Sequence, residues 1–467
     1  MSTDRRTPVD PVGRRAGPMN AAIRATGPSE QHLTRPTRTE NRIFTASVVV
    51  GMVHAGDDAL LGRQPGVELT QHLPGLVTVG CAAVLAIAVF PHLRPGLRSA
   101  LALAGAVIIG ANGVLHVMHL TELGPARSDA TGLLAALAAV VMLGLGLMIP
   151  VRHRGEVGGT AMRRWTRRVL AVVGAAAVAQ LVLMPVVVGL VHTHTFRHAI
   201  GEPPGPGYED VSFTSPDGLR LAGWYHPSSN GAAVLIVSSA RGDRSGSTAH
   251  AALLAQHGYG VLLYDARGTG LSEGSPNGWG WEWERDVSGA LDFLQESAGI
   301  DPHRIGGLGL STGADVLIES AAADSRLRAV VSDGATGRSF ADRPPGLLSA
   351  IVSAGMFTAG RLFSGAAPGE PLRELIADAA PTPILLIAAG TLPGEIAANE
   401  KYSEGPSARL WRLPHVGHTN AVVEVANEYE SRVLAHLDAA LLDHSSDSTA
   451  ASPQAHTSPA RGAVTRR

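Results

Sequence analysis

The sequence is poor in cysteine, lysine and charge. Its single cysteine, Cys81, can form no disulfide within the chain and no thiolate metal cluster. Charged residues make up 17% of the 467 residues, and 38 basic against 40 acidic residues leave a formal net charge of −2. This balance argues against a nucleic-acid partner, which would require a strongly basic domain. Hydrophobic residues reach 45%, which excludes a wholly disordered chain.

Apolar residues are concentrated in the first two hundred positions, in runs that contain no charge. A helix that crosses a bilayer needs about 20 mostly apolar residues. Four uncharged runs have that length, and a shorter run before them ends at Asp57 and Asp58. The sequence therefore predicts an N-terminal all-α transmembrane bundle over residues 43–196. Its helices, about five in number, are expected at residues 43–61, 73–93, 99–120, 130–151 and 169–191.

The arginines predict the orientation of these helices, because Lys and Arg favour the cytoplasmic side of a membrane. Eight arginines precede residue 43 and six lie between residues 152 and 168, whereas the first and third interhelical loops are poor in cations. We expect residues 1–42 to form a disordered basic arm in the cytoplasm. Five spans in the plasma membrane then place the rest of the chain outside the cytoplasm. Four spans would place it inside, and this alternative stays open.

From about residue 205 to 443, short apolar runs alternate with amphipathic stretches. A hairpin pattern over residues 208–225 comes first, and six compact apolar runs follow. This order predicts an α/β domain whose mostly parallel sheet carries helices on both faces. Residues 335–379 are expected to form a small apolar cap. Residues 444–467, rich in Ser, Thr, Ala and Pro, are expected to form a disordered tail.

Ser311 is the candidate nucleophile, within the pentapeptide Gly309-Leu-Ser-Thr-Gly313. This G-x-S-x-G pattern lies between a predicted strand and a predicted helix, where a sharp turn projects the serine hydroxyl. A second motif, Asp265-Ala-Arg-Gly-Thr-Gly-Leu-Ser272, precedes it. With these motifs, residues 205–443 resemble the α/β-hydrolase superfamily, in its esterase, thioesterase and serine-aminopeptidase-like branch. The resemblance implies that Asp265 and Arg267 frame the site rather than react.

The resemblance also implies that the acid and then the histidine follow the serine along the chain. A serine needs a base to take its proton, and the base needs an acid to orient it. His418, after the last predicted strand, is the expected base, with His415 as the alternative. Pro393 stands where the family usually has the acid. Glu395 is therefore the expected acid, and Asp333, at the end of an earlier strand, is the alternative.

The oxyanion hole of this family is formed by two backbone N–H groups. One is expected from Thr312, the residue after the nucleophile. The other is expected from Ala240, in the loop after the third strand, although this chain lacks the usual His-Gly there. Nearby, the alternating Trp279, Trp281 and Trp283 are interpreted mainly as packing residues, with contact to a substrate or to the membrane as the alternative.

These observations predict a membrane-anchored serine hydrolase that cleaves an ester or thioester, acyl or lipid-like, through an acyl-enzyme. Its expected partners are the bilayer and a small-molecule or lipid-like ester, and the triad chemistry requires no cofactor and no metal. One alternative is a serine peptidase of the same fold. Another is a catalytically inactive membrane protein whose hydrolase-like domain serves for binding.

Histidines also gather near the predicted outer ends of the helices. His54 precedes Asp57 by three residues, and His116 precedes His119 by three. Others follow the last predicted span: His192, His194 and His198. Imidazole and carboxylate groups at helical spacing can bind Zn²⁺. Histidine is equally well tolerated at a helix end, so the sequence alone assigns no metal ligand.

Overall fold

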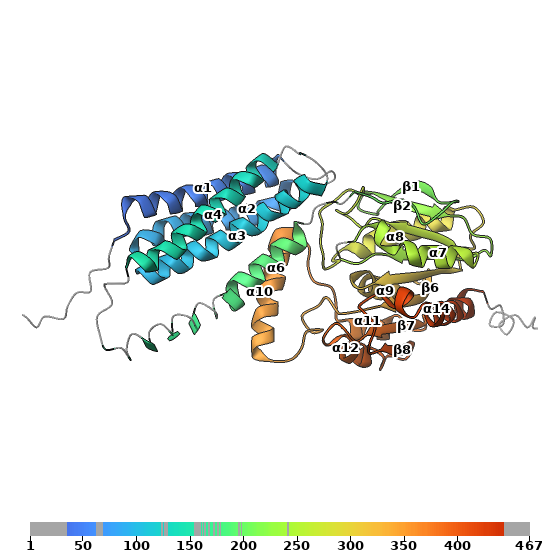
Figure 1. Ribbon diagram of the computed structural model, residues 1–467. Helices are drawn as coiled ribbons and strands as arrows, with labels where there is room; N and C mark the ends of the chain where they lie inside the picture. The colour runs from blue at the N-terminus through green and yellow to red at the C-terminus, as the bar shows by residue number, and fades with distance from the viewer. Residues whose placement is uncertain are drawn as a thin grey trace, which may run out of the picture.

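The computed structural model describes residues 35–61, 69–122, 129–153, 179–194, 199–240 and 242–442, with isolated residues between some of these ranges. A bundle of long helices and an α/β domain make up the chain (Figure 1). Helices α6 (Met184–Thr193) and α10 (Leu347–Ser364) pack against each other between them. The predicted tail and most of the predicted arm lie outside the described residues.

Four helices form the bundle: α1 (Arg38–Leu60), α2 (Leu69–Val89), α3 (Pro95–Glu122) and α4 (Asp129–Arg152). A short helical turn, η1 (Phe90–His92), follows α2. Helix α1 begins earlier than the predicted residue 43, because Thr37 and Glu40 form a capping box. Helices α3 and α4 pack most closely. A β-carbon on Gly113 would lie 2.7 Å from the backbone nitrogen of Ala136, so only glycine fits there.

Five described helices are long and apolar enough to cross a membrane, which indicates a membrane protein. The first four agree with the predicted spans, but the fifth is α10, within the predicted cap. The predicted span 169–191 lies partly outside the described residues. Its described end consists of a short π-helical stretch, η2 (Ala179–Leu183), followed by α6.

Helix α10 does not cross the bilayer as a single span. The strand before it, β6 (Leu327–Asp333), pairs in parallel with the strand after it, β7 (Ile384–Ala389). Both ends of the intervening segment therefore lie on the same side of a membrane, and no other described helix of that segment is long enough to bring the chain back. Instead α10 packs along α6, where a β-carbon on Gly189 would lie 2.6 Å from that of Ala359.

One sheet of eight strands forms the centre of the α/β domain, in the order β1-β2-β4-β3-β5-β6-β7-β8. The pairs β1–β2 and β2–β4 are antiparallel, and all later neighbours are parallel. The remaining strands are β1 (Glu209–Thr214), β2 (Arg220–His226), β3 (Ala233–Val237), β4 (Gly260–Tyr264), β5 (Ile305–Leu310) and β8 (Ala408–Leu413). The predicted fold class, a hairpin followed by a mostly parallel sheet, is confirmed.

Helices cover both faces of this sheet, so the central strands are buried throughout. On β3, Leu235 packs toward one core and Ile236 toward the other. One face is covered by α8 (Trp283–Glu296), α9 (Thr312–Ala323), α11 (Leu372–Asp378) and α12 (Glu395–Tyr402). The other face is covered by α7 (Thr248–Gln256), α13 (Ala421–Glu424) and α14 (Ala426–Leu441), and a short turn, η3 (Arg244–Ser247), precedes α7.

Candidate active site

Ser311 lies at the sharp turn between β5 and α9. Its φ of 53° is in the left-handed region, which a residue other than glycine seldom adopts. Two glycines make this turn possible. A β-carbon on Gly309 would lie 2.4 Å from the carbonyl oxygen of Gly313, and one on Gly313 would lie 2.2 Å from that of Val237. The turn therefore has the geometry of a nucleophile elbow.

His418, in the loop after β8, meets Glu395, the first residue of α12 after the neighbouring strand β7. The Nδ1 of His418 lies 2.7 Å from Oε2 of Glu395. Because a carboxylate only accepts, Nδ1 carries the proton, which leaves Nε2 as the basic nitrogen. The other carboxylate oxygen of Glu395 accepts a hydrogen bond of 2.7 Å from the backbone N–H of Ala389, and the side chain is fully buried.

Two further groups hold this pair in place. Gly394 has a φ of +87°, and this left-handed turn starts α12 so that Glu395 points back toward β7. The backbone N–H of His418 donates to the hydroxyl of Thr391 over 3.2 Å. Sequence reasoning did not identify Thr391, although its place in the loop that carries the acid is a usable signal.

Glu395 also raises the pKa of the histidine. Its hydrogen bond raises the pKa of His418 above 6.5, and burial opposes this increase. An acid in this position stabilises the imidazolium that forms when the histidine takes the serine proton.

The alternative acid, Asp333, is arranged differently. It is fully buried at the end of β6, and no hydrogen bond joins its carboxyl group to His418 in the described structure. Burial raises the pKa of Asp333 to about 7. Its backbone carbonyl accepts a 2.8 Å hydrogen bond from the N–H of Ser311. Asp333 thus contacts the elbow through its main chain.

His415, the alternative base, is exposed in the loop of His418. The buried carboxylate of Glu395 is directed to His418 rather than to this residue.

The two residues expected to form the oxyanion hole lie at the elbow and after the neighbouring strand. Thr312 begins α9, so its N–H belongs to the first turn of a helix. Ala240 is half-buried and follows β3, whose end touches Gly313. Its assignment to the oxyanion hole stays a prediction.

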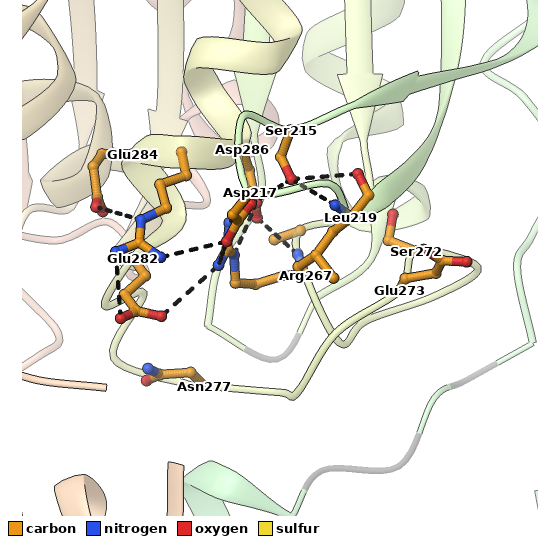
Figure 2. A network of polar contacts seen from close by, with 12 residues as sticks. Ser215, Asp217, Leu219, Arg267, Ser272, Glu273, Asn277, Glu282, Glu284 and Asp286 are labelled. Carbon is orange, nitrogen blue, oxygen red and sulfur yellow. Dashed lines mark hydrogen bonds and ion pairs between the residues drawn. The ribbon is translucent and has the colours of Figure 1, made fainter. Parts of the chain in front are cut away.

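The second sequence motif forms a loop that is hydrogen-bonded to β2 of the hairpin. The carboxylate of Asp265 accepts hydrogen bonds of 2.9 Å from the N–H groups of Arg244 and Leu271. The guanidinium of Arg267 donates to both Asp217 and Asp286 (Figure 2). The nitrogen–oxygen distances are 2.8 Å to Asp217 and 2.9 Å to Asp286. Asp265, Arg267 and Asp286 are buried, and their contacts fit the framing role implied by the resemblance.

The tryptophans connect the elbow with the apolar helices. Trp279 stacks on Trp281 with a centroid distance of 4.8 Å, and His192 of α6 stacks on Trp279 at 4.6 Å. Phe357 of α10 meets Trp281 edge-on at 5.7 Å. All three tryptophans are buried, as expected for packing residues. The hydroxyl of Thr312 donates, over 3.4 Å, to the carbonyl of Gly278, which lies in the same loop as Trp279 and Trp281.

Comparison with known proteins places the α/β domain among hydrolases. Residues 217–360 match the X-Pro dipeptidyl-peptidase (S15) family. An uncharacterized protein of Mycobacterium tuberculosis (strain CDC 1551 / Oshkosh) is 30% identical over 231 residues, which cover 46% of this chain and 74% of the relative. The thiohydrolase aneE of Aspergillus aculeatus is 35% identical over 132 residues, 27% of this chain and 41% of that protein.

Among solved structures, the Pyrococcus furiosus esterase Pf2001 has a TM-score of 0.44 and 21% identity. The alignment covers 53% of this chain and 98% of the esterase.

Proposed function

Since the chain belongs to the α/β-hydrolase superfamily, we propose that it is a membrane-anchored serine hydrolase that cleaves an ester or thioester through an acyl-enzyme. The observation that carries the proposal is the 2.7 Å contact between His418 and the buried Glu395. These two residues follow the adjacent strands β8 and β7, and Ser311 lies at the elbow after β5 of the same sheet.

In this mechanism the hydroxyl of Ser311 attacks the carbonyl carbon of the substrate while Nε2 of His418 takes its proton. The N–H groups of Thr312 and Ala240 bind the oxygen that becomes negative. His418 then gives the proton to the leaving alcohol or thiol, and the acyl group remains on Ser311. A water molecule, deprotonated by His418, then attacks the acyl carbon. The bond to Ser311 breaks, His418 returns the proton to the serine oxygen, and the carboxylic acid is released.

An apolar acyl chain suits the surroundings of this site. Helix α10 exposes large apolar side chains near its start, Leu347 at 80% and Leu348 at 61%. The same helix carries Phe357, which contacts Trp281. Trp279 and Trp281 lie in the loop before α8, here called the tryptophan loop. An exposed apolar surface on a helix beside four membrane-length helices can contact lipid, which favours a substrate that comes from the bilayer. We therefore propose a lipid-like ester or thioester.

A peptidase of the same fold is the second candidate, because residues 217–360 match the S15 family. That match includes Ser311 but ends before Glu395 and His418. The match therefore supports a hydrolase elbow at Ser311, but it does not distinguish an amide substrate from an ester. Thioester cleavage is supported by the similarity to the thiohydrolase of Aspergillus aculeatus.

The full-length protein in detergent distinguishes these functions. We expect p-nitrophenyl esters to be hydrolysed, long acyl chains faster than short ones, and Ser311→Ala to lose this activity. Aminoacyl and prolyl anilides are the matched amide substrates. A higher kcat/KM on the anilides than on the esters would show that the protein is a peptidase. Ester hydrolysis by Ser311→Ala at the native rate would reject the catalytic proposal.

A further inference from the structure

Three ionisable side chains lie together inside the helix bundle, away from Ser311. His54 and Asp58 are one turn apart on α1, and His116 reaches them from α3. The carboxylate of Asp58 stands between the two imidazoles: its Oδ2 is 3.4 Å from Nε2 of His54, and its Oδ1 is 3.7 Å from Nε2 of His116. One ligand atom from each residue can be chosen so that all three lie within 4.8 Å of one another.

This spacing fits a tetrahedral metal. Imidazole nitrogen and carboxylate oxygen bind Zn²⁺ at about 2.0–2.2 Å, and two such ligands of a tetrahedron lie about 3.3–3.6 Å apart. The separations of 3.4 and 3.7 Å are close to that value. Small side-chain adjustments would therefore place one ion between the two Nε2 atoms and the carboxylate.

The outer nitrogens of both imidazoles are held by further polar groups. The Nδ1 of His116 lies 3.1 Å from the carboxylate of the buried Asp129, and the Nδ1 of His54 lies 3.1 Å from the hydroxyl of Thr131. Thr131 donates in turn to Asp57 over 2.7 Å. Histidine ligands of metals typically have such partners, which fix the tautomer and turn Nε2 toward the ion.

The cluster contains a buried nitrogen whose hydrogen-bonding capacity is not used. His54 is 2% exposed, and its Nε2, although 3.4 Å from Oδ2 of Asp58, makes no hydrogen bond within the described part of the chain. A buried polar atom without a partner is costly, and ionisable groups within a membrane-spanning helix are rare unless they serve a site. A metal ion bound to Nε2 satisfies that atom.

The three side chains line a cavity of about 840 Å³ between α1, α2, α3, α6 and α10. Its walls are mostly apolar, but Asn112 beside the cluster donates to Asp58 over 3.3 Å. Ser275 and Pro276 of the α/β domain reach the same cavity. A metal held by three protein ligands at this wall has a further coordination position available toward the cavity.

We propose that His54, His116 and Asp58 bind one Zn²⁺ ion in the membrane domain, with the remaining coordination position open to the cavity. Two imidazoles and one carboxylate are a ligand set of zinc sites that keep a fourth position open, whereas Ca²⁺ and Mg²⁺ prefer oxygen ligands. The site is independent of the serine chemistry, because none of its residues contributes to the Ser311, His418 and Glu395 arrangement.

The test measures Zn²⁺ itself on the full-length protein in detergent. After incubation with Zn²⁺ and gel filtration, we expect elemental analysis to find about one ion per chain. X-ray absorption should show nitrogen and oxygen ligands, including imidazole. The double variant His54→Ala and His116→Ala should lose this ion. His92→Ala, which removes an exposed histidine of the same domain, is the matched control and should retain it.

A second variant keeps the test valid if the double variant does not fold. Asp129→Asn preserves shape but weakens the support of His116, and it should reduce Zn²⁺ affinity by about 10–100-fold. Circular dichroism establishes folding for each variant. Absence of Zn²⁺ from the folded native protein, or equal Zn²⁺ affinity in the folded Asp129→Asn and native proteins, would overturn the proposal and leave a hydrogen-bonded polar cluster.

Discussion

Glu395 shows how far single residues could be assigned from the sequence. Pro393 occupies the usual acid position, so the acid had to come from elsewhere, and the glutamate two residues later was the nearest carboxylate on that loop. The sequence predicted its pairing with His418, but not the geometry of the contact, which depends on the left-handed turn at Gly394. The sequence named the candidates, and the backbone turn brings one of them to the histidine.

The acid can be tested by exchanging carboxylates for amides. We expect Glu395→Gln to lower kcat by about 10⁴-fold, because the imidazolium formed at His418 loses its fixed anion. Asp333→Asn should cost at most about tenfold, ~1.4 kcal/mol, since burial raises the pKa of Asp333 to about 7 and its link to Ser311 runs through the main chain. Steady-state ester hydrolysis measures both. The reverse order of effects would make Asp333 the acid.

The pH dependence of the reaction follows from His418. Only neutral imidazole accepts the serine proton, so kcat/KM should fall as the pH drops through the pKa of His418, which Glu395 raises above 6.5. In Glu395→Gln this support is lost while burial remains, and the midpoint should move to lower pH. The pH profile of Ser311 labelling by a fluorophosphonate gives both midpoints. An unchanged midpoint would show that Glu395 does not act on His418.

The metal proposal corrects the residue pairing expected from spacing. The sequence paired His54 with Asp57 three residues on, but the structure turns Asp57 toward Thr131 and places Asp58 between His54 and His116. Both spacings lie on one helix face, so helical periodicity alone does not distinguish the two carboxylates. The distinction comes from His116 of α3, which is far away in the sequence and contacts Asp58.

Among the elements, the strands and the first four long helices were predictable from the sequence, whereas the place of α10 was less so. Compact apolar runs bounded by turn residues marked the strands from β3 onward, because a strand covered on both faces is apolar throughout. Helix α10 was expected only as part of a cap, although its length and apolarity are also those of a membrane span. The strands before and after it, β6 and β7, pair with each other, which shows that α10 does not cross the membrane as a single span.

The elbow can be tested through its second glycine. In Gly313→Ala the new β-carbon would lie 2.2 Å from the carbonyl oxygen of Val237, so β3 and the start of α9 would have to separate. We expect a loss of about 1–3 kcal/mol in stability or more, together with loss of ester hydrolysis.

Gly246→Ala is the matched control, because its β-carbon would meet nothing within 4 Å. Thermal unfolding of both variants in detergent provides the comparison. Equal midpoints and equal activity would contradict the tight elbow described here.

At the scale of the whole molecule, composition gave the division into an apolar N-terminal half and an α/β half. The sequence did not reveal how the halves touch, because the tryptophan loop meets α6 and α10 through stacking contacts between distant segments. Orientation in the membrane rests on the arginines, eight before residue 43 and six between residues 152 and 168. With α10 excluded as a span, the predicted helix at 169–191 determines whether the count is odd.

An external α/β domain is the expected orientation. Protease added to intact cells or spheroplasts should therefore remove a tag placed after Arg467. A matched tag before Met1 should survive, since the arginine-rich arm is expected in the cytoplasm. A tag after Arg467 that persists until the membrane is opened would show that only four spans cross and that the domain is cytoplasmic.

Labelling by a fluorophosphonate probe tests the central claim, a serine hydrolase built on Ser311, His418 and Glu395, most directly. The probe forms a covalent adduct only with a serine whose hydroxyl is activated by a neighbouring base. The native full-length protein should be labelled, with the adduct located on Ser311 by peptide mass spectrometry, and Ser311→Ala and His418→Ala should not react. No labelling of the folded native protein, or equal labelling of Ser311→Ala, would contradict the account.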